Sequence, residues 1–197
     1  MGSTAKRPVV MVLSGPNGSG KSTCATTLLP ADLHVQHFVN ADTIARGLSA
    51  FAPETTALKA GRLMLARLRE LSRQRADFAF ETTLSGRRHA NLLDSMRADG
   101  YRVYLIYIWL MTPELALQRV AERVRQGGHD VPESDVRRRY RRSIANLFEL
   151  YLPLADTWII LDNSATLVEV ARGRRTRPSH IFDHPKYDEI RKASKNK

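Results

Sequence analysis

The chain has 197 residues, of which 43% are hydrophobic and 26% charged, and 31 lysines and arginines against 20 acidic residues give it a formal charge of +11. Its size predicts one domain with a sizeable core, and its charge predicts an anionic partner or substrate. The single cysteine, Cys24, excludes an intrachain disulfide, and no apolar run reaches the roughly 18 residues of a membrane span. We therefore expect a cytoplasmic protein with no membrane partner.

Five apolar runs of strand length follow one another, and helix-patterned sequence separates each run from the next. The runs are Val9–Ser14, His37–Asn40, Phe78–Glu81, Tyr101–Leu110 and Thr157–Asp162. This alternation predicts an α/β fold of three layers, in which helices flank a central, mainly parallel five-stranded sheet. The fourth run is almost continuously apolar, which is typical of a central strand covered on both faces.

The remaining segments complete the predicted domain. Helical spacing of leucines in Glu54–Arg75, and a proline in the first turn of Pro113–Arg125, predict two of the helices. After the fifth strand comes one more amphipathic stretch, Leu167–Arg172, and then basic and polar sequence. We expect one domain over residues 1–173 and a basic polar tail over residues 174–197.

A phosphate-binding loop follows the first strand directly. The sequence GPNGSGKST matches G-x-x-x-x-G-K-[ST] in the strand–loop–helix context that this motif requires. Its glycines let backbone N–H groups converge on phosphate oxygens, and its lysine can reach the β and γ phosphates. The serine hydroxyl suits Mg²⁺, so the sequence predicts Mg²⁺ and a triphosphate cofactor, ATP, with GTP left open. We expect cofactor contacts from Gly15, Asn17, Gly18, Ser19, Gly20, Lys21, Ser22 and Thr23.

Asp42 lies just beyond the second strand, in the sequence NADT. In an open α/β sheet, ligands bind beyond the carboxyl ends of the strands. A carboxylate at this position can accept the proton of an attacking hydroxyl group. The alternative is that Asp42 only caps a helix starting at Thr43, and the residues alone favour neither reading.

The third strand also ends in polar residues. Glu81, Thr82, Thr83 and Arg87 supply a carboxylate, two hydroxyls and a guanidinium within seven positions. Such a cluster suits contacts to a substrate or to magnesium-bound water, and the arginine adds an anion-binding group. The alternative is that Glu81 is an ordinary strand-end residue. We favour a substrate site.

An arginine-rich segment spans residues 119–142, and the pair Gly127-Gly128 marks a turn within it. Arg119 and Arg123 share one helical face, which predicts a lid that closes over the triphosphate and neutralises its charge. The alternative is a solvated basic face that pairs with nearby acidic residues. A nucleic-acid patch is less favoured, because only one aromatic residue, Tyr140, stands among the arginines.

Five segments together resemble the zeta-toxin family of P-loop kinases, over about Val9–Ser164. They are GPNGSGKST, NADTIA, FETTLSGR, RVAERVRQGGHDVPE and WIILDNS. The family's best-understood members phosphorylate UDP-N-acetylglucosamine with ATP and Mg²⁺, and some are toxins restrained by an antitoxin. This compact chain looks more like the short chromosomal zeta-like group, so the resemblance implies kinase chemistry but leaves the acceptor open.

Carried over residue by residue, the resemblance assigns Lys21 to the phosphates, Ser22 to magnesium, Asp42 to the catalytic base and Glu81 to the acceptor side. Of the two lid arginines, it matches the first to Arg123. The second is Arg138, Arg139 or Arg142, and we assign the role to Arg139.

The leading hypothesis is therefore a kinase for UDP-N-acetylglucosamine or a related nucleotide-linked metabolite, with a small antitoxin protein as a candidate partner. The alternative is a nucleic-acid-directed P-loop protein, either a polynucleotide end kinase or an ATP-switched binder.

Overall fold

The computed structural model describes residues 7–31, 35–49, 53–128 and 130–195. In this part of the chain, the strands form one sheet in the order β2-β3-β1-β4-β5-β6-β7. The strands are β1 (Val9–Ser14), β2 (His37–Val39), β3 (Phe78–Thr82), β4 (Arg102–Trp109), β5 (Thr157–Asp162), β6 (Val168–Arg174) and β7 (Arg177–Ile181). β1 to β5 run parallel to one another, β6 pairs antiparallel with β5, and β7 pairs antiparallel with β6. The predicted mainly parallel α/β fold, with the fourth strand at its centre, is therefore confirmed.

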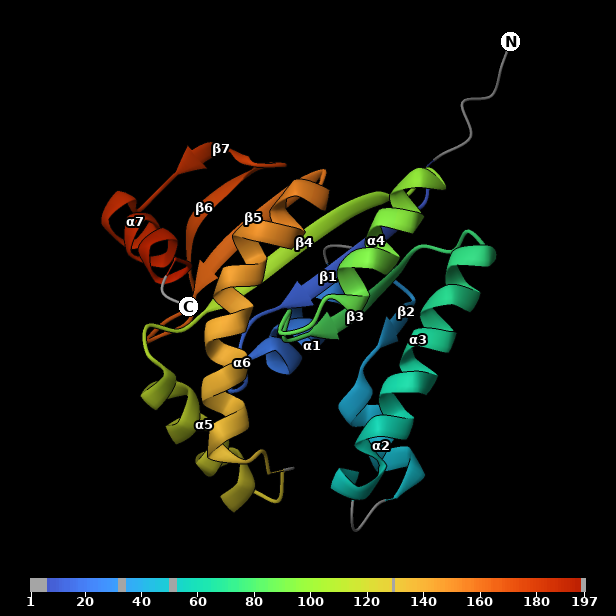
Figure 1. The fold of residues 1–197 in the computed structure, drawn as a ribbon, viewed down its shortest axis with the longest axis horizontal. Helices are drawn as coiled ribbons and strands as arrows, with labels where there is room; N and C mark the ends of the chain where they lie inside the picture. The colour runs from blue at the N-terminus through green and yellow to red at the C-terminus, as the bar shows by residue number, and fades with distance from the viewer. Residues whose placement is uncertain (1–6, 32–34, 50–52, 129, 196–197) are drawn as a thin grey trace.

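The helices alternate with the strands as the sequence predicts (Figure 1). They are α1 (Lys21–Ala31), α2 (Ala41–Leu48), α3 (Ala57–Arg73), α4 (Arg88–Ala98), α5 (Pro113–Arg125), α6 (Glu133–Asn146) and α7 (His184–Ala193). The predicted bounds of α5 are confirmed, because Thr112 caps its N-terminus by accepting the N–H of Leu115 at 3.1 Å. No helix in the described part of the chain has the length and apolarity to cross a membrane.

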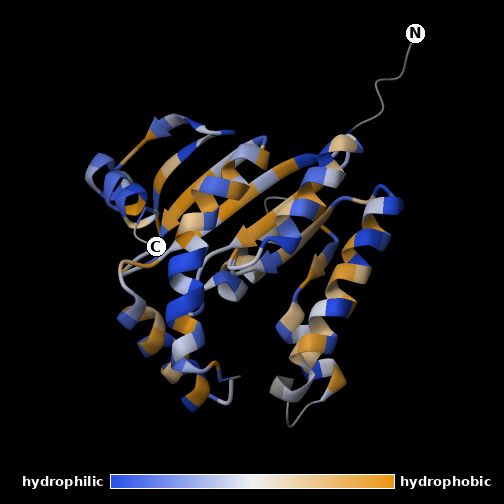
Figure 2. Ribbon diagram, viewed as in Figure 1, coloured by the Kyte–Doolittle hydropathy of each residue, from blue (hydrophilic) through white to orange (hydrophobic). Residues whose placement is uncertain are grey.

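The sheet separates two apolar clusters, because successive side chains of a strand point to opposite faces. Val10 and Val12 of β1 belong to a large cluster with residues of α3, α4 and α6. Met11 and Leu13 belong to a smaller cluster with Cys24 of α1. Figure 2 shows the strands as mostly hydrophobic and much of the outer surface of the helices as hydrophilic. The sheet is therefore buried between helices, which gives the expected three layers.

Two expectations about the C-terminal part were wrong. The described sheet has seven strands instead of five, and the sequence after residue 173 forms β7 and α7 instead of a polar tail. The reason is that these elements bury only one face: in α7, Tyr187 and Ile190 are buried while the other side is polar. Lys186 of α7 also lies 2.6 Å from Asp162 at the end of β5. A few buried apolar groups anchor a segment whose average composition is basic.

The packing of β6 on β5 leaves no room for a side chain at Gly173. A Cβ atom there would collide with the Trp158 ring and the Arg177 carbonyl, so we expect Gly173→Ala to lower the free energy of unfolding by about 2 kcal/mol. The matched control is Gly61→Ala in α3, where a Cβ atom meets nothing within 4 Å. This change should stabilise the protein by roughly 0.5–1 kcal/mol. Urea denaturation of both variants measures the difference, and equal effects would contradict the packing of β6.

Candidate active site

The loop between β1 and α1 has the backbone of a phosphate-binding loop. Gly18 and Gly20 have φ angles of +75° and +87°, which residues other than glycine rarely adopt. A Cβ atom would also lie 2.8 Å from the Ala116 carbonyl at Gly18 and 2.6 Å from the Asn163 amide at Gly20. Both glycines are therefore required by conformation and by close packing.

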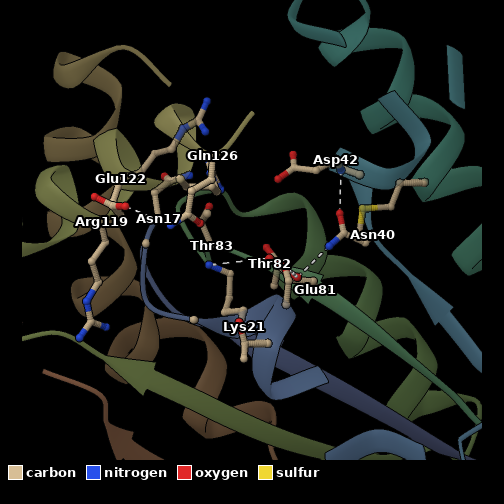
Figure 3. A pocket seen from close by; sticks show the side chains of 18 of the residues that line it. Asn17, Lys21, Asn40, Asp42, Glu81, Thr82, Thr83, Arg119, Glu122 and Gln126 are labelled. Carbon is tan, nitrogen blue, oxygen red and sulfur yellow. Dashed lines mark hydrogen bonds and ion pairs between the residues drawn. The ribbon is translucent and has the colours of Figure 1, made fainter. Parts of the chain in front are cut away.

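Lys21 is the buried charge of the site. Its Nζ donates to the Pro16 carbonyl at 2.8 Å and lies 3.8 Å from Glu81 Oε1 (Figure 3). Burial lowers the pKa of Lys21, the carboxylates of Glu81 and Asp42 oppose this shift, and the guanidinium groups of Arg123 and Arg139 add to it. The Lys21 ammonium group therefore interacts electrostatically with four charged side chains.

Glu81 connects the phosphate-binding loop to α2. Its Oε2 accepts hydrogen bonds from Ser22 Oγ at 2.9 Å and from Asn40 Nδ2 at 2.7 Å. The family resemblance implies an acceptor-side position for Glu81, whereas the structure places its carboxylate against the Ser22 hydroxyl. A hydroxyl and a carboxylate oxygen this close form a set of hard oxygen donors, which fits Mg²⁺.

Asn40, and not Asp42, caps α2. Asn40 Oδ1 accepts the N–H groups of Asp42 at 2.7 Å and Thr43 at 3.2 Å, and the helix begins at Ala41. The alternative in which Asp42 serves only as the cap is therefore wrong. Within the described residues the Asp42 carboxylate makes no hydrogen bond or ion pair, and Figure 3 shows it pointing into the pocket. Its position leaves it available for chemistry.

These residues line a cavity of about 470 Å³. The phosphate-binding loop and α1 form its floor, α2 and the end of β3 form one wall, and α5 and α6 form the other. Of the residues predicted from the sequence, the lining includes Asn17, Gly18, Gly20, Lys21, Ser22, Thr23, Asp42, Glu81, Thr82, Thr83, Arg123 and Arg139. The structure therefore brings most of the predicted site together. Residue 129, within the predicted lid, lies outside the described residues.

Two predicted arginines lie differently from the expectation. Arg119 lines the cavity, but its Nη2 donates to the Ser164 carbonyl at 3.2 Å, and the side chain runs away from Lys21 (Figure 3). Arg87 does not line the cavity and lies in a neighbouring groove. Helical spacing alone cannot tell which way a long side chain turns, and strand-end proximity cannot fix the path of the following loop.

Sequence reasoning missed three residues of the site. Asn40 orients both α2 and Glu81, and asparagine at a helix start is a readable capping signal. Asn163 Nδ2 donates to the Ser19 carbonyl at 2.9 Å, a contact across 144 positions that no local pattern reveals. His89 lines the cavity and approaches Thr82 Oγ1 at 3.3 Å, and burial lowers its pKa to about 4. His89 is therefore neutral at pH 7.

Comparisons with known proteins show the family and the fold. A family model described as an AAA domain matches residues 10–147. An uncharacterized protein of Haemophilus influenzae (strain ATCC 51907 / DSM 11121 / KW20 / Rd) is 33% identical over 126 residues, which are 64% of this chain and 88% of that protein.

Two kinds of solved structure share the fold. Structures of the AvrRxo1-ORF1:AvrRxo1-ORF2 complex with sulphate ions and with ATP match with TM-scores of 0.75 and 0.74 and identities of 17% and 18%. In each, the match covers 94% of this chain and 64% of that chain, so this chain spans less than two thirds of its length. The PezAT chromosomal toxin–antitoxin system of Streptococcus pneumoniae matches with a TM-score of 0.68 and 16% identity, over 99% of this chain and 81% of that chain.

The lowered pKa of Lys21 predicts a proton uptake on nucleotide binding. In the free protein, Lys21 therefore loses its proton at a lower pH than an ordinary lysine, whose pKa is 10.5. A bound triphosphate stabilises the ammonium form, so binding at alkaline pH should take up a proton, and the uptake should grow as the pH rises through the lowered pKa. Calorimetry in two buffers of different ionisation enthalpy measures this uptake.

The control for this prediction is Lys21→Arg, whose guanidinium stays charged throughout the range and should take up no proton. Equal proton uptake in both proteins would assign the effect to another group.

Proposed function

Because the chain belongs to the AAA domain family, whose matched residues include the phosphate-binding loop, we propose that it is an ATP- and Mg²⁺-dependent kinase. Its acceptor is a hydroxyl group of UDP-N-acetylglucosamine or a related nucleotide-linked metabolite. The observation that carries this proposal is one cavity lined by five charged residues, in which the charges of Asp42, Glu81, Arg123 and Arg139 all act on Lys21. A nucleotide switch needs no second carboxylate beyond the phosphate site, whereas transfer to a hydroxyl uses one as a base.

The donor side is formed by the phosphate-binding loop. Its backbone N–H groups and Lys21 hold the phosphates, and the ammonium is already desolvated, so its attraction to an added negative charge is weakly screened. Arg123 and Arg139 face this position from α5 and α6. They neutralise charge that develops on the transferred group. We propose that α5 moves as the lid, because hydrogen bonds of Tyr140 and Ser143 hold α6 in place.

Mg²⁺ would be held by Ser22, with Glu81 orienting the water molecules around it, and the ion would supply charge neutralisation to the phosphates. Asn40 fixes Glu81 for this role through the 2.7 Å hydrogen bond to Oε2. The same asparagine fixes the start of α2, so the metal side and the base side share one support.

Asp42 is the proposed general base. It lies at the N-terminus of α2, across the cavity from the arginines, and its carboxylate accepts the proton of the attacking hydroxyl. Thr82 and Thr83 line the same wall and offer hydroxyl groups to the acceptor. The likeness in fold to a toxin–antitoxin system supports a small antitoxin as a partner.

The base and the donor lysine can be separated by mutation. We expect Asp42→Asn to lower kcat by about 10²–10⁴ while nucleotide binding persists, because the amide cannot accept the proton. Lys21→Ala should lower kcat by about 10²–10³ and also weaken nucleotide binding. Acceptor-dependent ADP release with UDP-N-acetylglucosamine and a panel of other nucleotide-linked metabolites measures both effects.

The control is Asp94→Asn on the exposed face of α4, which should leave the rate unchanged. Full activity in Asp42→Asn would remove the base from the mechanism. Failure of the whole panel would remove this acceptor class.

The metal assignment has its own test. Ser22→Ala loses the hydroxyl group and should raise the Mg²⁺ concentration required for half-maximal activity by about tenfold or more, whereas Ser22→Thr keeps the hydroxyl and should behave like the wild type. Chelation of Mg²⁺ should abolish transfer in all three proteins, and activity that persists in the chelator would contradict metal dependence.

A further inference from the structure

A second groove lies next to the proposed active site, between the loop that follows β3 and the outer face of α6. Figure 1 shows this loop beside α6. The groove has a volume of about 620 Å³ and is lined by Ser85, Gly86, Arg87, Arg138, Arg141, Arg142, Ala145, Asn146 and Glu149.

The groove concentrates positive charge, most of which is not paired within the described part of the chain. The side chains of Arg87, Arg141 and Arg142 make no hydrogen bond or ion pair within the described residues, and only that of Arg138 is paired, with Asp135 at 2.7 Å. The one carboxylate in the lining is that of Glu149. Four arginines line this one hollow, although Arg141 also lines a second one beside α7. Like charges so placed repel one another, and a bound anion relieves this repulsion.

The walls of the groove are fixed to each other. Asn146 Nδ2 donates to the Leu84 carbonyl at 2.6 Å, and Tyr151 Oη donates to the Gly86 carbonyl at 2.7 Å. Leu84 itself is fully buried with a φ of +55°, an unfavourable conformation that the surrounding contacts maintain. The position of Arg87 relative to α6 is therefore set before any ligand binds.

The groove adjoins the active-site cavity along both of its walls. Thr83 lines the cavity, Ser85 lines the groove, and their hydroxyl groups are 2.8 Å apart. On α6, Arg139 faces the cavity, while its neighbour Arg138 faces the groove. A molecule with a hydroxyl group near Asp42 can extend past Thr83 into the groove.

We propose that this groove binds a phosphate or diphosphate group of the acceptor, so that the substrates are phosphorylated metabolites. This inference rests on the proposed kinase function, and it makes Arg87 and Arg142 specificity-determining residues. The described lining contains no aromatic side chain on which a base could stack, so the groove suits the phosphate groups of an acceptor better than the successive bases of single-stranded nucleic acid.

The first experiment measures anion binding without catalysis. Inorganic pyrophosphate is titrated calorimetrically, without Mg²⁺, into the Lys21→Ala protein, in which the phosphate-binding loop is weakened. Adding Arg87→Ala and Arg142→Ala to this background should weaken pyrophosphate binding by about a hundredfold, because two charge-assisted contacts are lost. Adding Arg88→Ala, an exposed arginine next in sequence that lies outside the groove, should change nothing.

The second experiment measures specificity in the otherwise unmodified enzyme. The Arg87→Ala/Arg142→Ala protein should show a KM for UDP-N-acetylglucosamine raised by about a hundredfold, with the KM for ATP and the thermal midpoint of unfolding unchanged. The Arg88→Ala protein is again the control.

The two experiments fail in different ways. Pyrophosphate binding that the groove arginines do not affect would overturn the inference, whatever the enzyme phosphorylates. Groove-dependent binding without any transfer would overturn the proposed function and leave the anion site standing. Tight, groove-dependent binding of a short RNA oligonucleotide with a steep salt dependence would replace the metabolite by nucleic acid.

Discussion

The buried ammonium group of Lys21 is the constraint on which the site depends. A lysine in this position loses its hydration, so its pKa falls unless anions compensate. In the free protein, Glu81 provides this compensation from β3, the strand beside β1 in the sheet. The parallel pairing of these two strands puts the end of β3 next to the phosphate-binding loop, and this is why the sheet order matters for the chemistry.

Asn40 extends this arrangement to the opposite side of the cavity. Its amide donates to Glu81, and its carbonyl oxygen caps α2, so one side chain sets both the carboxylate beside Ser22 and the direction of the helix that carries Asp42. A helix that already has a cap does not need Asp42 for that purpose. Within the described residues, the Asp42 carboxylate makes no hydrogen bond or ion pair. This is the basis for its proposed role in proton transfer.

The arginines of α6 line two different hollows. Arg139 faces the active-site cavity, and Arg138, Arg141 and Arg142 face the adjoining groove. Tyr140 and Ser143, between them, hold the helix by hydrogen bonds to the Leu110 carbonyl at 2.7 Å and to Tyr107 at 3.1 Å. Because α6 is held by its buried side, its charged residues can line both the cavity and the groove. The two proposed anion contacts therefore use different arginines of the same helix.

The sequence by itself determined the phosphate-binding loop, the parallel α/β alternation and the polar residues that end the second and third strands. These features are local: apolar runs, glycine spacing and strand-end polar residues are each written in a few consecutive positions. Only the tertiary structure decided that Asn40 donates to Glu81, that Arg119 turns toward Ser164 and that Arg87 belongs to a second groove. It also decided that the basic C-terminal sequence adds β6, β7 and α7. The physical reason is that a long side chain, or a segment with one buried face, takes its place from partners far away in the chain, and local sequence carries no information about those partners.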